Sequence, residues 1–536
     1  MKALLLLLLV SVGLAVNLSE KYELYKKFLK TKDERLGREL LKRYPDAPFR
    51  DELILTLAEL LSKSKPAEAR RLILKARLRR LPAKRVVKLW RRLKLPERRL
   101  VLTYPELFPS KVLKLRLSPA ERERLARRLF KKRKYRLVLK LSRDCYLRGV
   151  SYYRTGRKEK GLRLLEGCGR EKAKEFLLYA YLSLKRYGSL DALLKKEQSP
   201  RLYFLAGREL LERGLPERAK KYLERSGVNE AVFYLGLYHY LKGEYEKAYE
   251  RFSAYAGKES KRRFWLFKSA LAAGKKDEAL KQLTLAARFD DFYGAVAKKL
   301  LGLPVYKEVK LEGRPRLFYE LKRIRELGFP HYARVEAFRH ERLVSVGDVL
   351  RLKEVDPYLA IRLAVRRFGV SSPVYKAVSH PTPYGGIVRQ VSRRFGVPPA
   401  LIYAVMRQES LFDPYAVSPA GAKGLMQLMD FTARWKARRL GYRYRSVFDP
   451  FTNVYLGTAY LRFLLDYWDG NLVKAVASYN AGHGAVSRWR GYDDEFLFIE
   501  LIPYNETRKY VKRVLYNYYL YDEKLNGSRR KTARSE

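Results

Sequence analysis

The chain has 536 residues, with 115 Lys and Arg against 57 Asp and Glu, so its formal net charge is +58. Its length excludes a single hydrophobic core and predicts about three structural units. The charge favours polyanionic partners, namely nucleic acid, anionic lipid head groups or the carboxylate-bearing polymers of a cell wall, although a merely solvated basic surface is the alternative. Residues 381–536 hold 24 Lys and Arg against 14 Asp and Glu, so the preceding 380 residues carry +48 of the total.

Residues 1–16 have the pattern of an export signal. Lys2 is followed by the apolar run 3–10 and by small residues at Gly13 and Ala15. An early positive charge, a short apolar stretch and small residues at the end are typical of a signal cleaved near Ala15, and the run is too short to span a membrane. No cysteine follows the expected cleavage site, so we expect a periplasmic protein without a lipid anchor.

Residues 18–370 are predicted to be almost entirely helical, because apolar residues recur three and four positions apart and strand-like alternation is scarce. A small residue or Tyr followed five positions later by Ala or Gly recurs at steps of 31, 27, 29 and 31 residues, as in Gly243 and Ala248. This period predicts a tetratricopeptide-like α-superhelical solenoid over 17–300, with ordinary helical hairpins as the alternative. We expect a helical linker domain over 301–380.

Proline and paired glycine interrupt the helical pattern between Ser371 and Gly386, which predicts a domain boundary. Beyond it we expect a compact all-α domain over 381–522, with loops rich in Gly, Pro and Asp. Its predicted helices cover 387–395, 398–410, 424–439, 453–468, 472–480 and a segment from 506 onward. The last residues, 523–536, are basic and are predicted to form a disordered tail.

One carboxylate stands out in this C-terminal domain. Glu409 lies three, four and seven residues after Met406, Val405 and Ile402, so at helical spacing it shares their apolar face. Burial raises the pKa of a carboxyl group, and a glutamic acid that keeps its proton near neutral pH can donate it to a leaving group. Glu409 is therefore the predicted catalytic acid, and a structural acid in a helix-end network is the alternative.

Four motifs around this residue resemble those of the soluble lytic transglycosylase family. They are Glu409-Ser410, the block from Gly424 to Gln427, the segment 478–482 (Ser-Tyr-Asn-Ala-Gly) and the segment 506–511 (Glu-Thr-Arg-Lys-Tyr-Val), and they occur in the order and spacing of that family. The resemblance covers residues 381 to about 522. It implies a lysozyme-like α fold preceded by an α-superhelical region.

The resemblance also implies an activity. Members of the family cleave the β-1,4 bond between MurNAc and GlcNAc in peptidoglycan without water and close a 1,6-anhydro ring on MurNAc. A single Glu then suffices as acid and base, because attack by the sugar's own C6 hydroxyl replaces the second carboxylate of ordinary glycosidases. The family pattern further implies substrate contacts from Ser418, Met426, Gln427, Tyr479, Asn480 and Glu500. Glu506 fits helix-start chemistry better.

Cofactors and metals are not expected. The five histidines have no metal-binding spacing, and neither a phosphate-binding glycine loop nor a Cys-rich cluster is present. The two cysteines, Cys145 and Cys168, can pair in an oxidising compartment, but two buried thiols are the favoured interpretation.

Three functions therefore remain open. The first is an exported lytic transglycosylase that acts as a monomer on peptidoglycan glycan strands, with an anionic membrane surface as a further partner and no nucleic acid. The second is a hydrolytic muramidase of the goose-type lysozyme kind. The third is a helical-repeat wall-binding protein without catalysis.

Overall fold

The computed structural model describes residues 17–532, and side chains are described as far as residue 526. The expected export signal, 1–16, lies outside the described residues. The described chain is all helical apart from turns, loops and isolated β-bridges in the 417–428 loop. This confirms the expected all-α class. No helix within the described part of the chain is both long and apolar enough to cross a membrane.

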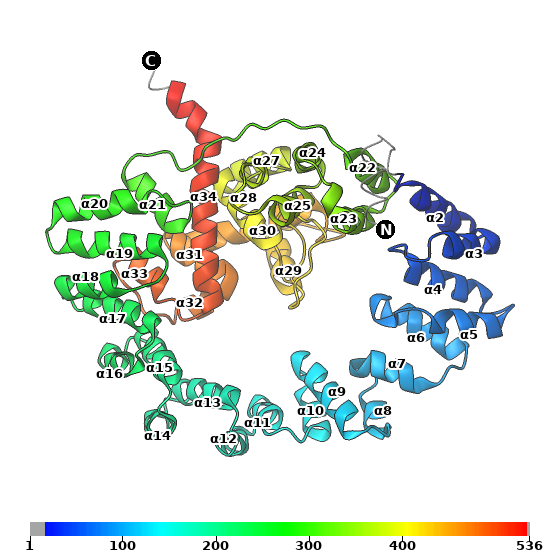
Figure 1. Cartoon of the computed structure of the whole chain (residues 1–536), viewed down its shortest axis with the longest axis horizontal. Coiled ribbons are helices and arrows are strands. Elements are labelled where there is room, and N and C mark those ends of the chain that lie inside the picture. The colour runs from blue at the N-terminus through cyan, green and yellow to red at the C-terminus, as the bar shows by residue number, and fades with distance from the viewer. Residues whose placement is uncertain (1–16, 533–536) are drawn as a thin grey trace. The chain divides into compact units, whose positions relative to one another are not determined.

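The chain divides into two compact units, which are coloured by position in Figure 1. Among the described residues, unit 1 contains 17–193 and 315–344, and unit 2 contains 194–314 and 345–532. The expected linker domain over 301–380 is thus divided between the two units. Its middle part, 315–344, packs with the N-terminal helices, because Glu320 accepts from the backbone N–H groups of Leu18 and Ser19, at 2.8 Å each.

Unit 1 consists of short helices in successive pairs. Their bounds are α2 Glu20–Thr31, α3 Glu34–Arg43, α4 Arg50–Leu61, α5 Pro66–Leu74, η1 Leu78–Arg80, α6 Ala83–Arg92, α7 Glu97–Thr103, η2 Pro105–Leu107, α8 Pro109–Lys114, α9 Pro119–Lys131, α10 Tyr135–Leu141, α11 Cys145–Arg154, α12 Lys158–Glu166 and α13 Glu171–Ser183, followed later by α22 Phe318–Glu326, α23 Pro330–Arg339 and η3 Glu341–Leu343. The helix α14, Tyr187–Glu197, lies where the two units meet in the sequence.

The solenoid part of unit 2 contains α15 Pro200–Glu212, α16 Pro216–Ser226, α17 Asn229–Leu241, α18 Tyr245–Ala254, α19 Glu259–Ala272, α20 Lys276–Ala286 and α21 Phe292–Leu300. Consecutive helices pack as hairpins, and the repeat predicted from sequence marks their turns. Gly243 follows α17 with φ +76°, a left-handed conformation that glycine adopts without strain, and Ala248 is fully buried in α18. The stacked helical pairs confirm the expected solenoid.

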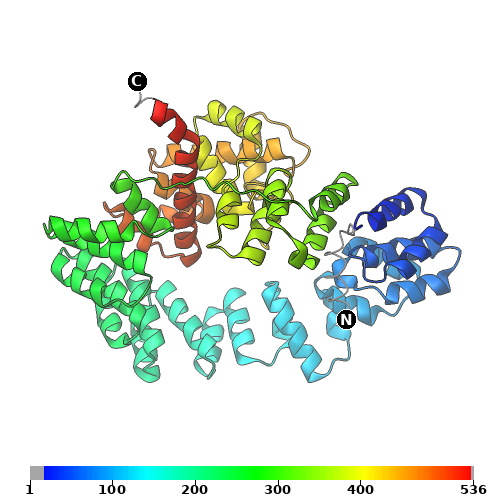
Figure 2. The same cartoon turned by 45° about the horizontal axis from the view of Figure 1, so that its top comes forward.

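The C-terminal part of unit 2 holds α24 Val346–Val355, α25 Pro357–Phe368, α26 Pro373–Val378, α27 Gly385–Phe395, α28 Pro399–Ser410, α29 Asp430–Arg439, α30 Pro450–Tyr467, α31 Leu472–Ala481, α32 His483–Val486, α33 Glu495–Glu500 and α34 Asn505–Thr532. The central helix is α28, whose residues 400–406 are all buried. The long helix α34 packs against α28 and α31, as Figure 2 shows.

Helix α34 continues to Thr532, so residues 523–532 are helical where the sequence predicts a disordered tail. Contacts at the start of this segment account for the difference. Glu523 accepts from the backbone N–H groups of Val305 and Tyr306, and Lys524 donates to the carbonyl of His380 at 2.6 Å. These tertiary bonds hold the helix beyond residue 522, which composition alone did not indicate.

Cys145 and Cys168 form a disulfide, with their Cα atoms 5.7 Å apart. Cys145 is the first residue of α11, and Cys168 follows α12, so the bond joins the two ends of one helical hairpin. The favoured expectation of two buried thiols is therefore wrong. The hairpin brings together two residues that are 23 positions apart in the sequence.

Candidate functional site

Glu409 occupies the last turn of α28, and its carboxyl group is held by a residue of α34. The hydroxyl of Tyr510 donates to Glu409 Oε1 at 2.7 Å. Burial raises the pKa of Glu409 to about 7, the Tyr510 hydrogen bond opposes this rise, and the negative charge of Glu506 adds to it. Glu409 therefore holds a proton to near neutrality, as its apolar helix face predicted.

The loop after α28 is fixed to the helix end by Ser410. Its hydroxyl donates to the carbonyl of Leu425 at 2.8 Å, and its side chain is 7% exposed. From α30, Asn453 accepts from the N–H of Met426 at 2.7 Å and donates to the carbonyl of Lys423 at 2.9 Å. Gly424 has φ +78°, and a side chain there would collide with Asn453, so the position needs glycine. The wall beside Glu409 is thus rigid.

Ser418 and Gln427 lie in this loop and are partly buried. The Ser418 hydroxyl oxygen accepts from the N–H of Ala422 at 3.0 Å and stabilises the turn that precedes the block from Gly424 to Gln427. The Gln427 side-chain amide donates to the carbonyls of Ala416 and Gly424, at 3.1 and 2.9 Å. Both side chains shape the loop, a role that the sequence did not predict.

Met426 is placed differently from the expected position in the cleft. Its side chain is fully buried, and a Cβ on Gly457 of α30 would lie 2.5 Å from its sulfur. Met426 therefore belongs to the core between the loop and α30. The helix predicted over 424–439 begins only at Asp430, so Met426 lies in the turn before it, and packing against Gly457 accounts for its position in the core.

Tyr479 and Asn480 come from the end of α31. The Tyr479 hydroxyl donates to the carbonyl of Met426 at 2.9 Å, and the charge of Glu409 contributes to raising the pKa of Tyr479, after burial. Tyr479 therefore lies close enough to Glu409 to feel its charge, and the substrate contact that the family resemblance implies for Tyr479 stays a prediction. Asn480 is exposed and accepts from the Thr507 hydroxyl at 2.7 Å, which ties α31 to the first turn of α34.

Glu500 lies in a separate buried cluster. Its carboxylate is 2% exposed, is 2.7 Å from the ammonium of Lys512 and 3.4 Å from that of Lys261, and also accepts from the Tyr293 hydroxyl. Burial alone would raise the pKa of Glu500, but the two lysines outweigh it and hold the pKa well below its usual range. The cluster joins α33 and α34 to α19 and α21 of the same unit. Glu500 thus has partners different from those of Glu409, and the substrate contact expected for it stays a prediction.

A second buried cluster anchors the start of α34. The Arg508 guanidinium forms an ion pair with Glu212 of α15 and donates to the Tyr234 hydroxyl of α17. Burial raises the pKa of Glu212 to about 7 against the attraction of Arg508 and Arg208. Arg508 and Lys512 flank Tyr510 on the same helix, so the solenoid helices of unit 2 help to hold the residue that contacts Glu409.

Two residues near Glu409 were not selected from the sequence. Tyr510 was part of a quoted motif but received no role, and Glu506 was assigned to helix-start chemistry. Glu506 is exposed in the first turn of α34, where its charge influences Glu409. The sequence does contain a signal that links these two residues. Tyr510 is four residues after Glu506, and residues four apart share a face of a helix.

Metal coordination has no evident place in the described chain. Among residues 17–532, no group of three His, Cys, Asp or Glu is arranged to hold a metal ion.

The C-terminal region of the chain matches a known family of domains. Residues 386–502 match the family model of the transglycosylase SLT domain. An uncharacterized protein of Aquifex aeolicus is 44% identical over 139 residues, which is 25% of this chain and 77% of that protein. The soluble lytic murein transglycosylase of Escherichia coli K12 is 29% identical over 287 residues, which is 49% of this chain and 44% of that enzyme. The sequence match thus spans less than half of that curated relative.

Solved structures share the fold along nearly the whole chain. The 70-kDa soluble lytic transglycosylase of Escherichia coli has a TM-score of 0.63 at 19% identity, with 96% of this chain and 93% of that chain covered. Lytic transglycosylase Slt from Pseudomonas aeruginosa, solved as an inactive Glu-to-Gln mutant, has a TM-score of 0.57 at 23% identity, covering 95% of this chain and 92% of that one. These similarities confirm a helical superhelix followed by a lysozyme-like domain.

Proposed function

Because the chain belongs to the transglycosylase SLT family, we propose that it is a peptidoglycan lytic transglycosylase with Glu409 as its single acid and base. The substrate would be the glycan strand, cut between MurNAc and GlcNAc with a 1,6-anhydroMurNAc end. The observation that carries this proposal is the Glu409 carboxyl group itself: burial raises its pKa to about 7, and it accepts a hydrogen bond from Tyr510 in a site built from the family motifs.

In the proposed reaction, Glu409 donates its proton to the glycosidic oxygen as the bond from that oxygen to C1 of MurNAc breaks. The C6 hydroxyl oxygen of the same sugar then bonds to C1, and its proton passes to the Glu409 carboxylate. The proton lost in the first step is thus recovered in the second, and no water is consumed. Attack within one sugar has a high effective molarity, so no second carboxylate is needed to activate a nucleophile.

The neighbouring residues have proposed roles that follow from their contacts. Tyr510 orients the Glu409 carboxyl group, and Tyr479 and Gln427 hold the loop that forms the wall of the site. Ser418 and Asn480 are proposed to contact the sugars, since one lies at the loop turn and the other is exposed at the end of α31. The inactive Glu-to-Gln mutant of the Pseudomonas aeruginosa relative supports dependence on one glutamate.

The mass of the products tests this reaction. Purified sacculi are digested with the wild-type protein, and the released fragments are weighed. Anhydro ends, lighter by one water than reducing ends, are expected. Reducing ends would instead favour the hydrolytic muramidase, and binding without release would favour a non-catalytic wall-binding protein.

Two matched variants assign the acid. Glu409→Gln is expected to lower turnover about a thousandfold while binding to sacculi is retained, because a positioned general acid and base contributes roughly 10²–10⁴-fold. The Glu506→Gln variant tests whether a second carboxylate is essential for the reaction. It is expected to release a measurable amount of anhydro product. Loss of all turnover in Glu506→Gln, together with reducing ends in the wild type, would contradict the single-acid mechanism.

Export to the periplasm is part of the proposal. The Cys145–Cys168 disulfide supports an oxidising compartment, where such bonds persist. N-terminal sequencing of the protein recovered from a periplasmic extract is expected to begin just after Ala15. A cytoplasmic protein that retains Met1 would contradict this part of the proposal without affecting the reaction.

A further inference from the structure

Residues 70–140 of unit 1 carry an unusual density of positive charge. This segment holds 27 Lys and Arg against 4 Asp and Glu, a net charge of +23. Among the described residues, its basic side chains form only four ion pairs: Arg85 with Glu59, Arg98 with Glu121, Lys111 with Glu97 and Lys132 with Glu106. Most of the charge therefore has no counter-charge within the described chain.

One hollow in this segment combines apolar and basic groups. It has a volume of about 470 Å³, and Val87, Leu107 and Phe108 supply its apolar lining. Lys84, Lys88 and Arg91 of α6 are exposed at its rim, and no acidic residue lines it. Leu107 is 52% exposed, which is a high value for a leucine among cations.

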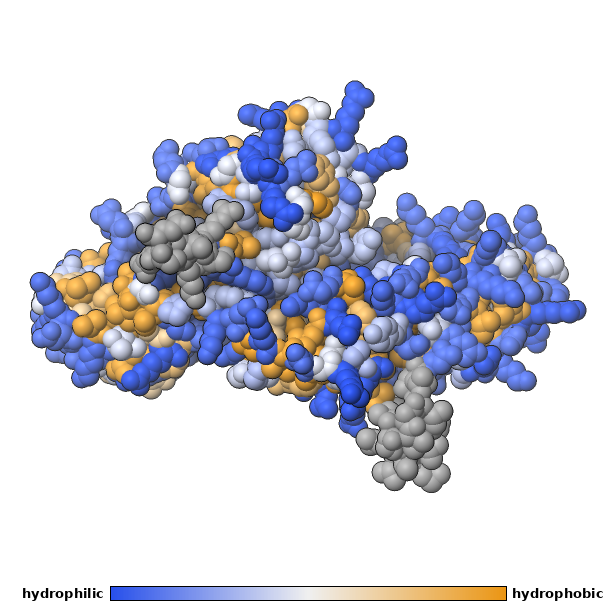
Figure 3. Space-filling model, turned by 90° about the horizontal axis from the view of Figure 1, so that it is seen from above, coloured by the Kyte–Doolittle hydropathy of each residue, from blue (hydrophilic) through white to orange (hydrophobic). Residues whose placement is uncertain are grey.

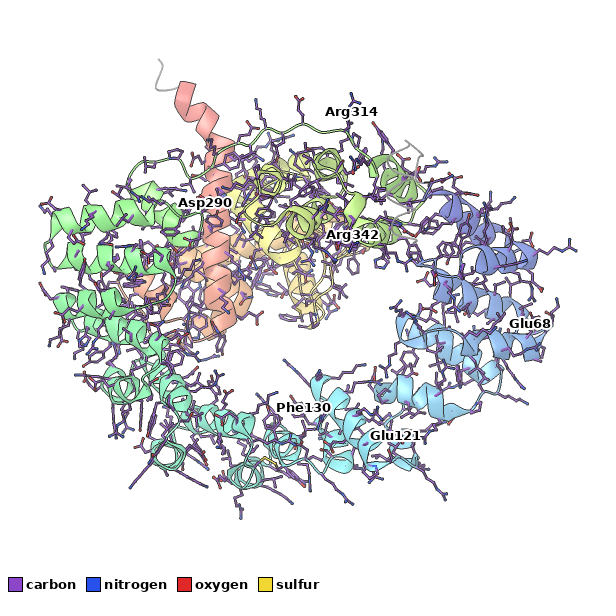
Figure 4. All side chains as sticks on the ribbon, viewed as in Figure 1. Glu68, Glu121, Phe130, Asp290, Arg314 and Arg342 are labelled. Carbon is purple, nitrogen blue, oxygen red and sulfur yellow. A yellow bond between two sulfur atoms is a disulfide. The ribbon has the colours of Figure 1, made fainter. Side chains whose placement is uncertain are left out.

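A second hollow, of about 480 Å³, repeats this combination beside α9. Leu102 and Leu125 line it together with Arg79, Arg124, Arg127 and Lys131. Its one acidic residue, Glu121, is paired with Arg98 from the neighbouring α7. Figure 4 marks Glu121 and Phe130, which lie near the two ends of α9.

Arg128 shows that the cations of the second hollow are crowded. Its guanidinium is fixed by donating to the carbonyls of Leu102 and Thr103, at 2.9 and 2.5 Å. Burial and then the positive charge of Arg79 lower the pKa of Arg128. An anion that binds here would relieve this repulsion, and guanidinium groups match phosphate oxygens well.

We propose that the surface formed by residues 70–140 docks on a membrane face that contains anionic phospholipid. Lysine and arginine side chains would meet head-group phosphates, while Leu107 and its apolar neighbours enter the boundary below the head groups. Basic residues interleaved with exposed leucines are the pattern of peripheral membrane binding. This inference does not depend on the proposed reaction.

The exposed apolar residues favour lipid over the other polyanions. The large hydrophobic side chains exposed in this segment are Leu74, Leu107 and Leu113, and none of them is aromatic. Single-stranded nucleic acid is usually bound by basic grooves with exposed aromatic side chains for stacking, and a duplex phosphate backbone gives leucine nothing to contact. Figure 3 shows the face seen from above, which is opposite to this segment, and there too hydrophobic residues are interspersed among hydrophilic ones.

The test uses the full-length protein and sedimentation with vesicles. Vesicles of phosphatidylcholine alone are compared with vesicles that also contain phosphatidylglycerol. Binding is expected only with phosphatidylglycerol, and it should fall steeply when salt is raised, because exposed charges are screened. Equal binding to both vesicles, or none to either, would overturn the proposal.

Two triple variants and one single variant locate the surface. The first triple variant combines Lys84→Ala, Lys88→Ala and Arg91→Ala, and the second combines Arg124→Ala, Arg127→Ala and Lys131→Ala. Each triple variant should lower the vesicle partition coefficient about a hundredfold, at roughly fivefold per cation. Leu107→Ser should lower it about fivefold without any change in charge. Circular dichroism and thermal unfolding verify that each variant is folded.

A matched triple variant in unit 2 is the control. Lys221, Arg225 and Lys276 are exposed cations outside the segment, and replacing them with Ala should leave vesicle binding at the wild-type value. An equal loss in this control would show a non-specific charge effect and overturn the proposal.

Two other polyanions are distinguished by the same variants. Weaker binding of the unit 1 variants to sacculi but not to vesicles would assign the surface to cell-wall carboxylates, and tight binding to nucleic acid at physiological salt without vesicle binding would assign it to nucleic acid. Either result overturns the membrane proposal. Glu409→Gln should still bind vesicles, so failure of the reaction and failure of docking are distinguishable.

Discussion

The buried clusters of unit 2 and the segment 70–140 of unit 1 use the same charged residue types in opposite ways. In unit 2, Arg508, Glu212 and Glu500 are buried, and they form ion pairs between segments far apart in the sequence, with the partly buried Lys512 and Lys261 as the partners of Glu500. In residues 70–140 of unit 1, the cations are mostly exposed, and few have an acidic partner. A buried charge must have a partner because its desolvation is costly, whereas an exposed charge is solvated by water and remains available to bind a partner. Burial thus separates the charges that hold the fold together from those that are free to bind.

The largest effect on stability is expected from Arg508→Ala. The substitution removes the closer of the two cations of the buried Glu212 carboxylate and leaves only Arg208, whose Nε lies 3.5 Å from it, so the free energy of unfolding should fall by about 3 kcal/mol at pH 8. The loss should be smaller at pH 5, because Glu212, with its pKa already raised to about 7, then takes a proton. Urea unfolding at the two pH values measures the difference.

Arg513→Ala provides the control for this prediction on the same helix. Arg513 is exposed, and a surface substitution of this kind should change the free energy of unfolding by about 0.5 kcal/mol or less. A loss below about 1 kcal/mol in Arg508→Ala at pH 8 would show that the buried pair does not distinguish unit 2 from unit 1.

The next effect concerns Glu409, whose carboxyl group accepts from the Tyr510 hydroxyl. Its pKa of about 7 lies above the ordinary 4.5, so the folded protein holds this proton more tightly than the unfolded chain does. The resulting stability is fully present below about pH 4 and is lost as the pH rises through 7. Glu409→Gln should therefore match the wild type at pH 4 and exceed its free energy of unfolding by about 1–3 kcal/mol at pH 8. Unfolding curves for the two proteins that coincide at every pH would contradict the raised pKa.

Tyr510→Phe should have a smaller effect on stability and a distinct effect on catalysis. Losing one hydrogen bond costs about 1 kcal/mol, and a less well oriented acid should lower turnover about tenfold. The Tyr510 hydroxyl lowers the pKa of Glu409, so its removal should raise that pKa further. Wild-type activity should decline as the pH rises above about 7, and this decline should move to higher pH in the variant. A pH profile of anhydro product release measures both effects, and an unmoved profile would show that the tyrosine has only a structural role.

The smallest effect on stability is expected from the exposed cations of unit 1. Lys88→Ala should change the free energy of unfolding by about 0.5 kcal/mol or less, and added salt should stabilise the wild type slightly by screening repulsion between like charges. Thermal unfolding at low and moderate salt checks both statements. A large loss of stability in Lys88→Ala would mean that this charge has a structural partner, which contradicts the comparison between the units.

Much of the architecture and the catalytic candidate could be predicted from local patterns. Helical spacing of apolar residues identified the all-α class, and the turn glycines of the repeat, such as Gly243, fall at the ends of helical hairpins. Glu409 was found because it shares a face with Met406 and Val405, and that face is buried in the structure. These features depend on residues within a few turns of one another.

The features that differed depend on contacts between distant segments. Met426 is in the core because Gly457 leaves space for it, and Glu500 is buried because Lys261 and Lys512 reach it from two other helices. Residues 523–532 stay helical beyond the predicted end because Glu523 and Lys524 have tertiary partners. A spacing rule contains no information on such partners, so sequence patterns could not have indicated them.

By itself, the sequence determined where helices form, where the chain carries its excess of positive charge and which carboxyl group shares an apolar helix face. All of these follow from the order of residues along one segment and the fixed periodicity of the α-helix. Only the tertiary structure decided that Tyr510 holds Glu409, that Arg508 and Lys512 fasten the same helix to the solenoid, and that Cys145 meets Cys168. The reason is physical: burial and hydrogen bonding depend on which distant surfaces meet, and those surfaces exist only once the chain has folded.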